Sequence, residues 1–170
     1  GGRRGSAFGL DFLLESQFEN GAWPQWYPLR GGYHDHYTFN DNSINDCIRV
    51  ARLAHQRYGR KDCLKAALAG GDFILESQLP APQAGWAQSY SHDRRPAKAR
   101  AVAPAGVCSA VTSRNLRSLL DLHLATGEAR FLNAFPAADK WLERSKISEN
   151  LWARFYELKT NKPIYGDRDG

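Results

Sequence analysis

Apolar residues recur at intervals of three and four along most of this chain, which is the spacing of one face of an α-helix. The pattern predicts helices over residues 5–17, 41–58, 61–78, 109–125 and 128–144. Pro136 lies inside the last of these ranges and is expected to kink that helix. The alternation of apolar and polar residues that is typical of strands is scarce. We therefore predict an all-α chain with loops between the helices and after Ser145.

The chain contains an internal repeat. Residues 9–17 (GLDFLLESQ) match residues 70–78 (GGDFILESQ) at seven of nine positions. Three similar aromatic segments are also present, WPQWY at 23–27, WAQSY at 86–90 and WARFY at 152–156. Repeated units stack with their equivalent loops on one face, so we predict an incomplete ring of three helical-hairpin repeats with long functional loops. Because five helices are one short of three hairpins, residues 1–170 are expected to be a single domain that is truncated at both the N-terminus and the C-terminus.

Composition and charge indicate which kinds of binding partner the protein favours. The formal net charge is +5 and the pI is about 9.2, which favours an anionic partner. No apolar stretch approaches the roughly 18 residues that cross a bilayer, so no transmembrane helix is predicted. The three cysteines lack the spacing of a zinc site, and buried free thiols are expected. A bridge between Cys47 and Cys63 stays open as an alternative.

The three aromatic segments are candidates for a carbohydrate surface. Trp and Tyr offer flat apolar faces to sugar rings and a polar edge to hydroxyl groups, although a role in the core explains the Trp residues equally. The middle position of each segment is polar among aromatic residues. We expect these middle residues to face a shared cleft, and they are Gln25, Gln88 and Arg154.

A second group of polar residues, between 33 and 42, offers metal ligands. His34 and His36 have no third ligand at a convincing spacing, which disfavours zinc. Asn40, Asp41 and Asn42 carry hard oxygen atoms that suit calcium, and the same residues would also cap the helix that follows.

Basic residues gather in the second half of the chain. A planar guanidinium recognises carboxylates through two parallel hydrogen bonds, so a polymer of sugar acids would suit this set. The basic residues are Arg94, Arg95, Lys98, Arg100, Arg114, Arg154 and Arg168.

Taken together, these motifs resemble the pectate lyases of polysaccharide lyase family ten. The resemblance covers nearly the whole chain and rests on long segments in the same order, namely NGAWPQWYPLRGGYHDHYTFNDN (20–42), GWAQSY (85–90), PAKARA (96–101), CSAVTS (108–113), LWARFYEL (151–158) and NKPIYGDRDG (161–170). It implies an (α/α) toroid that cleaves polygalacturonate by calcium-dependent β-elimination and releases 4,5-unsaturated oligogalacturonides. It also implies a secreted or periplasmic monomer.

The resemblance assigns roles to individual residues. Arg154 would be the base that removes the C5 proton, and Asp41 would hold Ca²⁺. With the residues of the motifs above, the full prediction has Asp41, Asn42 and Asp93 as calcium ligands, and the predicted substrate-binding residues are Trp23, Gln88, Lys98, Arg100, Arg114, Tyr156 and Arg168. The chain departs from the family pattern at Ser91, where an Asp that helps to hold calcium is usual. This departure weakens the metal site or transfers the role to Asp93.

Two other classes of function remain open at this stage. One is a pectate-binding module that has kept the groove and lost catalysis. The other is an inverting glycoside hydrolase that uses Asp41 and Asp93 as acid and base. Nucleic-acid binding ranks last, because no recognised nucleic-acid motif accompanies the positive charge.

Overall fold

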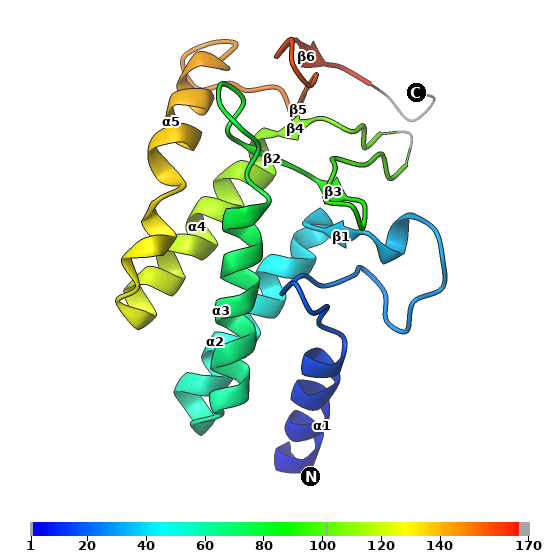
Figure 1. Cartoon of the computed structure of the whole chain (residues 1–170), viewed down its shortest axis with the longest axis vertical. Coiled ribbons are helices and arrows are strands. Elements are labelled where there is room, and N and C mark those ends of the chain that lie inside the picture. The colour runs from blue at the N-terminus through cyan, green and yellow to red at the C-terminus, as the bar shows by residue number, and fades with distance from the viewer. Residues whose placement is uncertain (1, 101, 167–170) are drawn as a thin grey trace.

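Five α-helices are the main elements of the structure, a computed structural model that describes residues 2–100 and 102–166, with side chains from residue 8 onward. They are α1 (Gly2–Glu15), α2 (Ser43–Tyr58), α3 (Lys61–Glu76), α4 (Ser109–Thr126) and α5 (Phe135–Arg144). Three short 3-10 helices are η1 (Tyr33–Asp35), η2 (Asn40–Asn42) and η3 (Ala129–Leu132). Helix α3 packs against both α2 and α4, and the strands and long loops lie at one end of these helices (Figure 1).

Each predicted helix is present, but the last one differs from its prediction. Residues 128–144 form η3 and then a separate helix, α5, instead of one kinked helix. Pro136 lies in the first turn of α5. A proline is favourable there because the first amides of a helix have no partner within the helix.

The prediction of an all-α toroid is wrong, because the described residues also form two antiparallel sheets. Strands β1 and β3 make a 2-stranded sheet, and β2, β4, β5 and β6 make a 4-stranded sheet in that order. The strands are β1 (Tyr37–Thr38), β2 (Trp86–Ala87), β3 (Ser89–Tyr90), β4 (Val107–Cys108), β5 (Phe155–Tyr156) and β6 (Pro163–Ile164). Each strand has two residues and pairs with a distant segment, so no alternating pattern could reveal it. The chain is therefore a mixed α and β structure.

The repeated aromatic segments share one set of hydrogen bonds. The indole Nε1 of Trp86 donates to the carbonyl of Ile74 at 2.7 Å, near the end of α3. Trp152 donates in the same way to Leu142 of α5 at 2.7 Å, and Trp23 donates to Leu13 of α1 at 2.9 Å. Each Trp thus satisfies a carbonyl near a helix end that lacks a partner within the helix.

The Tyr residues of the last two segments repeat a second pattern. The hydroxyl of Tyr90 accepts from the amide of Ala87 and donates to the carbonyl of Ser77, both at 2.8 Å. The hydroxyl of Tyr156 accepts from the amide of Ala153 at 2.9 Å and donates to the carbonyl of Ser145 at 2.5 Å. Both Tyr side chains are buried, so they fix the loop after each helix to that helix.

Two adjacent glycines let α3 approach its neighbours closely. A Cβ on Gly70 would lie 2.6 Å from the side chain of Ile48 in α2, and one on Gly71 would lie 2.5 Å from Leu122 in α4. Any larger residue at either position would separate the helices. The glycines therefore set the distance between α2, α3 and α4, whose ends carry the site described below.

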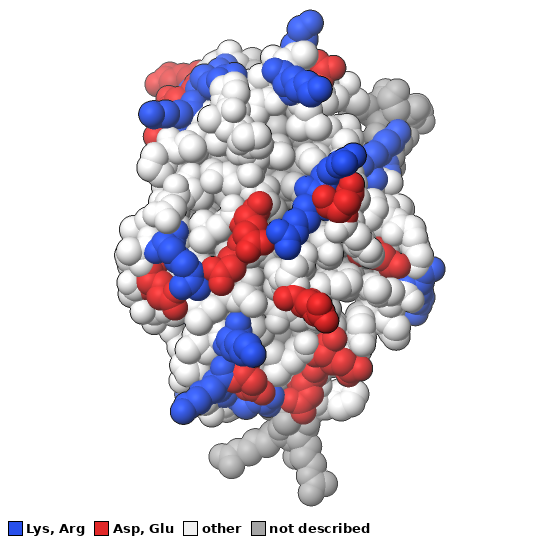
Figure 2. All heavy atoms as spheres, viewed as in Figure 1, with Lys and Arg blue, Asp and Glu red and all other residues white. Residues whose placement is uncertain are grey.

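Other sequence predictions concern the surface and the thiols. Cys47, Cys63 and Cys108 are all free. Within the described residues, no helix combines the length and apolar character that a bilayer span requires. The face in Figure 2 shows Lys and Arg interleaved with Asp and Glu, without one dominant basic patch. On this face, positive charge is therefore a local property of single surface clefts.

Candidate functional site

One cleft collects residues from four separate segments of the chain. Its volume is about 320 Å³. Residues 39–41 before α2, Gln88 between β2 and β3, residues 108–114 at the start of α4, and Arg154 before β5 line it. Because α2 and α4 both begin beside this cleft, it receives the positive ends of two helix dipoles. This arrangement favours an anionic ligand.

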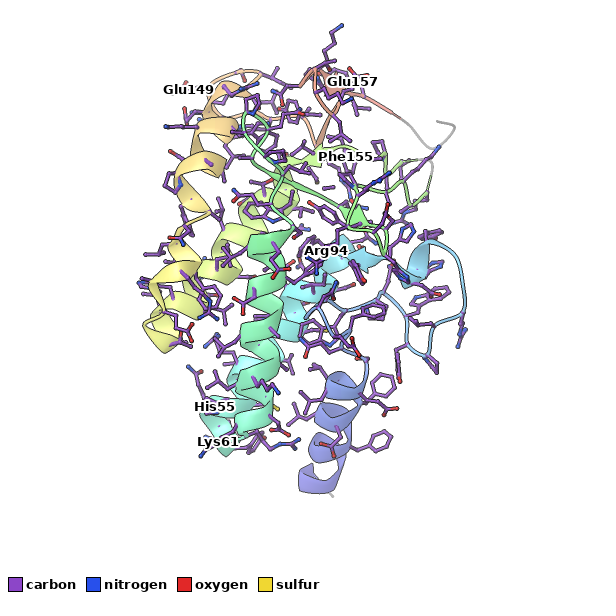
Figure 3. The ribbon with its side chains drawn as sticks, viewed as in Figure 1. His55, Lys61, Arg94, Glu149, Phe155 and Glu157 are labelled. Carbon is purple, nitrogen blue, oxygen red and sulfur yellow. The ribbon has the colours of Figure 1, made fainter. Side chains whose placement is uncertain are left out.

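Arg154 is held in the cleft by its neighbours. Its Nη2 atom donates a hydrogen bond to Oε1 of Gln88 at 3.1 Å, and its guanidinium lies 5.2 Å from the ring centre of Phe155. Phe155 belongs to β5 in the strand-rich part of the molecule (Figure 3). Gln88 is buried, with 3% of its surface exposed, so it offers a fixed acceptor to the more mobile arginine side chain. The pair orients one guanidinium toward the cleft.

Asp41 is presented by an unusual turn. Its φ angle is 51° and that of Asn42 is 63°, a left-handed conformation that Asp and Asn tolerate better than most residues. Its Oδ2 atom accepts a hydrogen bond from Nδ2 of Asn40 at 2.7 Å and another from Nε2 of Gln25 at 3.4 Å. The sequence motif Asn-Asp-Asn therefore fixes a carboxylate at the mouth of the cleft.

The charged side chains of the cleft are two arginines and one aspartate. Arg114 lies on α4 and Arg154 precedes β5, opposite the turn that carries Asp41. The lining therefore has a net positive charge of one before the helix dipoles are counted. A carboxylate on a sugar would find two guanidinium partners here.

Cys108 lies in the floor of the same cleft. Burial raises the pKa of its thiol, and the amide of Val111 and the guanidinium of Arg154 offset this only in part. The thiol is thus protonated at neutral pH and is not a nucleophile. Its place in the cleft was missed by sequence reasoning, since a lone cysteine carries no spacing signal.

Several residues predicted to bind substrate do not reach the cleft. Trp23 and Tyr156 are each only 1% exposed and serve the hydrogen bonds described above. Lys98 and Arg100 are exposed but do not line this cleft. Arg168 lies outside the described residues. Of the predicted site residues, the structure brings together Asp41, Gln88, Arg114 and Arg154.

The amino-acid sequence matches a known protein family. The family model for pectic acid lyase matches residues 3–150 and 144–170. The chain belongs to the pectic acid lyase family. No curated protein matches this pectic acid lyase chain.

Two similar solved structures are family 10 polysaccharide lyases from Cellvibrio cellulosa. One is an aspartate-to-alanine mutant in complex with trigalacturonic acid, with 27% sequence identity and a TM-score of 0.81. The other has 25% identity and a TM-score of 0.77. The alignments cover 94% of this pectic acid lyase chain, but only 60% and 59% of those chains.

The calcium that the family resemblance implies does not fit a site built by this chain alone. Ca²⁺ takes six to eight oxygen ligands, usually with several carboxylates. Asp41 is the only carboxylate that lines the cleft, and no group of three or more His, Cys, Asp or Glu residues forms a metal site within the described residues. Of the other predicted ligands, Asn42 lines a neighbouring hollow, and Asp93 does not line the cleft but forms an ion pair with Arg95 at 3.0 Å.

The environment of Asp93 also disfavours the predicted alternative of an inverting glycoside hydrolase. A hydrogen bond from the Ser91 hydroxyl, together with the nearby Arg95, lowers the pKa of Asp93. A general acid needs a raised pKa, and Asp93 does not line the cleft that holds Asp41. Among the residues that the structure describes, the cleft therefore presents the carboxylate of Asp41 without that of Asp93.

Proposed function

We propose that this chain carries the substrate-binding and catalytic cleft of a pectate lyase that cleaves polygalacturonate by β-elimination. The observation that carries the proposal is the convergence of Arg114 and Arg154 on one cleft beside the starts of two helices. Membership of the pectic acid lyase family and a relative solved with trigalacturonic acid support it. The proposal concerns only the part of the enzyme that this chain spans.

Binding would rest on charge. The carboxylate of a galacturonate unit pairs with the guanidinium group of Arg114, and charge-assisted hydrogen bonds to arginine are among the stronger ones in proteins. The positive ends of α2 and α4 would add to the same attraction. These groups draw electron density from the carboxylate and so acidify the neighbouring C5–H bond.

In the elimination step, Arg154 acts as the base. Its guanidine, in the neutral form, accepts the C5 proton, and the electrons of the C–H bond form a double bond between C4 and C5. The C4–O bond breaks, and the glycosidic oxygen leaves and takes up a proton from solvent. The products are a shortened chain and a 4,5-unsaturated uronide, so all atoms are accounted for without water entering the bond.

Two uncharged side chains would position the charged ones. Gln88 is buried and holds Nη2 of Arg154, so it limits the directions in which the base can point. Asn40 is buried and holds the carboxylate of Asp41, which faces the arginines across the cleft. Fixed geometry of this kind lowers the entropic cost of reaching the transition state.

The described residues offer calcium one carboxylate, so we propose that Arg114 and the starts of α2 and α4 carry most of the charge neutralisation. Any Ca²⁺ that enters with the substrate would be held largely by substrate carboxylates and water, with Asp41 as its protein ligand. We also propose that the protein acts outside the cytoplasm, because its polymeric substrate is found there, and that it acts as a monomer.

The decisive assay measures the ultraviolet absorbance of unsaturated uronides when the full-length protein meets polygalacturonate, with and without calcium. We expect product from the wild type. Arg154→Ala should lower kcat by about 10³-fold or more, because it removes the base, while trigalacturonate still binds. Arg57→Gln, at the far end of α2 near His55 (Figure 3), is a matched control that removes one positive charge away from the cleft.

Each alternative outcome has a distinct signature. Trigalacturonate binding without product from the wild type would indicate a pectate-binding module. Saturated sugars as products would indicate a hydrolase. Full activity of Arg154→Ala would remove Arg154 from its role as the base.

A further inference from the structure

A second hollow lies beside the cleft, between α2 and α4, and we call it the α2–α4 groove. Its volume is about 160 Å³, enough for about one sugar unit. Its lining comes almost entirely from one face of each helix, and consists of Asn42, Asn45, Asp46, Ile48, Arg49, Arg52, Arg114, Arg117, Ser118 and Asp121. None of these residues except Asn42 and Arg114 has a role in the sequence predictions.

The groove is positively charged, since four arginines face two aspartates. Arg49 pairs with Asp46 at 3.3 Å and Arg117 pairs with Asp121 at 3.4 Å. Both pairs are exposed, and exposed pairs of this kind exchange partners at little cost. Among the described residues, the guanidinium of Arg52 donates a hydrogen bond to the neutral side chain of Gln56 at 3.1 Å and to no carboxylate.

Within residues 2–100 and 102–166, neither Arg52 nor Arg114 forms an ion pair. The two aspartates neutralise two of the four arginines. Two guanidinium groups thus remain for a ligand that carries a carboxylate.

The groove also contains buried oxygen acceptors that lack donors. Asn45 is 7% exposed, and its Nδ2 atom donates to Oδ1 of Asn115 at 2.9 Å and to Oγ of Ser118 at 3.0 Å. Its own Oδ1 atom has no partner among the described residues, and the same holds for Oδ1 of Asn42. Both oxygen atoms are themselves shielded from solvent, so the groove presents its arginine side chains to a ligand and not these acceptors.

The groove and the cleft are neighbours. Arg114 lines both hollows, and the consecutive residues Asp41 and Asn42 line one each. Arg49 and Arg52 on α2 are three residues apart, as are Arg114 and Arg117 on α4. Three residues correspond to a rise of about 4.5 Å along a helix, which is comparable to the length of a sugar ring. A polymer that leaves the cleft past Arg114 would therefore meet further arginines.

We propose that the α2–α4 groove is a further subsite that binds a uronate unit of the same polymer, outside the cleft where the bond is cleaved. Arg52, which has no acidic partner among the described residues, pairs with the carboxylate of that unit, and the exposed guanidinium of Arg117 exchanges Asp121 for the same carboxylate. This proposal rests on the proposed function. It names a substrate preference, namely that chains long enough to reach the groove bind more tightly than short ones.

The test compares the affinities of trigalacturonate and hexagalacturonate by calorimetry on the full-length protein. In the wild type we expect the hexamer to bind more tightly than the trimer. Arg52→Gln should reduce the ratio of the two affinities about tenfold, as expected for the loss of one charge-assisted hydrogen-bonded pair. Arg57→Gln lies on the same helix outside the groove and should leave the ratio unchanged. Circular dichroism confirms that each variant is folded.

Arg117→Gln, on the facing helix, gives a second reading of the same subsite if Arg52→Gln fails to fold. A ratio that is unchanged in the folded variants, or equal binding of trimer and hexamer by the wild type, overturns the subsite while the proposed function stands. If the wild type binds neither oligomer, the proposed function and the subsite both fail. Equally tight binding of heparin, with the same sensitivity to Arg52→Gln, would make the groove a general polyanion surface and also overturns the proposal.

Discussion

Removing the hydroxyl of Tyr156 tests whether this residue supports the fold or contacts the substrate. The sequence predicted a substrate contact, whereas the structure buries the side chain in two hydrogen bonds. Its hydroxyl accepts from the amide of Ala153 and donates to the carbonyl of Ser145. Tyr156→Phe keeps the ring, which packs edge-on against Trp141 at 5.5 Å, and removes only the oxygen atom.

The size of the stability loss follows from the two backbone groups that lose their hydrogen-bond partner, the amide of Ala153 and the carbonyl of Ser145. Each buried amide or carbonyl that is left without a hydrogen bond costs about 1–3 kcal/mol. Because both groups lie in a region that excludes water, we expect a loss of about 2–6 kcal/mol in the free energy of unfolding. For a chain of this length, 1 kcal/mol corresponds to roughly 2–4 °C, so Tm should fall by about 4–24 °C.

Thermal unfolding followed by circular dichroism measures this change. The chain supplies a matched control, since Tyr27 holds the equivalent position in the first aromatic segment but donates only to the carboxylate of Glu15 at 3.2 Å in an exposed setting. Tyr27→Phe should shift Tm by less than about 2 °C, as is usual for surface changes. A Tyr156→Phe variant with wild-type Tm and weaker trigalacturonate binding would refute the structural role.

Two further predictions concern the metal and the backbone. Calorimetry of the protein without substrate should show calcium binding no tighter than about 1 mM, since Asp41 is the one carboxylate of the cleft, and a micromolar Kd would reveal ligands outside the cleft. Gly21→Ala should cost about 3 kcal/mol or more in the free energy of unfolding, because φ is +87° and the new Cβ would lie 2.1 Å from the carbonyl oxygen of Ala69. Gly127→Ala is the control, because φ is +75° but no atom lies within 4 Å of the new Cβ, and it should cost only about 1–2 kcal/mol. Urea titration measures the free energy of unfolding of both variants, and equal losses would contradict the steric argument.

The helices could be predicted because their signal is local and redundant. Residues 9–17 and 70–78 share hydrogen bonds as well as amino-acid identity. Ser16 and Ser77 each bond to the carbonyl three residues earlier, and Gln17 and Gln78 each donate to two carbonyls, one of them on a neighbouring helix or loop. The repeat in the sequence is thus a repeat of helix ends.

The strands could not be predicted, because their signal is neither local nor long. Trp86 pairs with Cys108, and Cys108 pairs in turn with Phe155. Two residues cannot display an alternating pattern, and only the folded chain brings these three segments together. The expectation of an all-α fold failed for this reason, although every predicted helix exists.

The residues of the candidate site also divide into those placed by local structure and those placed by the folded chain. Asp41, Gln88, Arg114 and Arg154 were all predicted, and they line one cleft because each lies next to a helix start or a strand of the sheet. Lys98 belongs to a long loop between β3 and β4, whose path follows from no local pattern, and it lies elsewhere on the surface. Residue type alone does not decide the role of Trp23, because an indole suits a sugar platform and a buried helix end equally well, and here its Nε1 atom donates to the carbonyl of Leu13.

The aromatic segments explain how a repeated scaffold can build a site that is not repeated. In the copies at 86–90 and 152–156, the Trp and Tyr positions hold the segment to the preceding helix. The middle position is then free to differ, and Gln88 and Arg154, which occupy it, bond to each other at 3.1 Å. In the first copy the middle residue, Gln25, bonds to Asp41. The structural residues are thus the constant part of the repeat, and the chemistry lies in the residue between them.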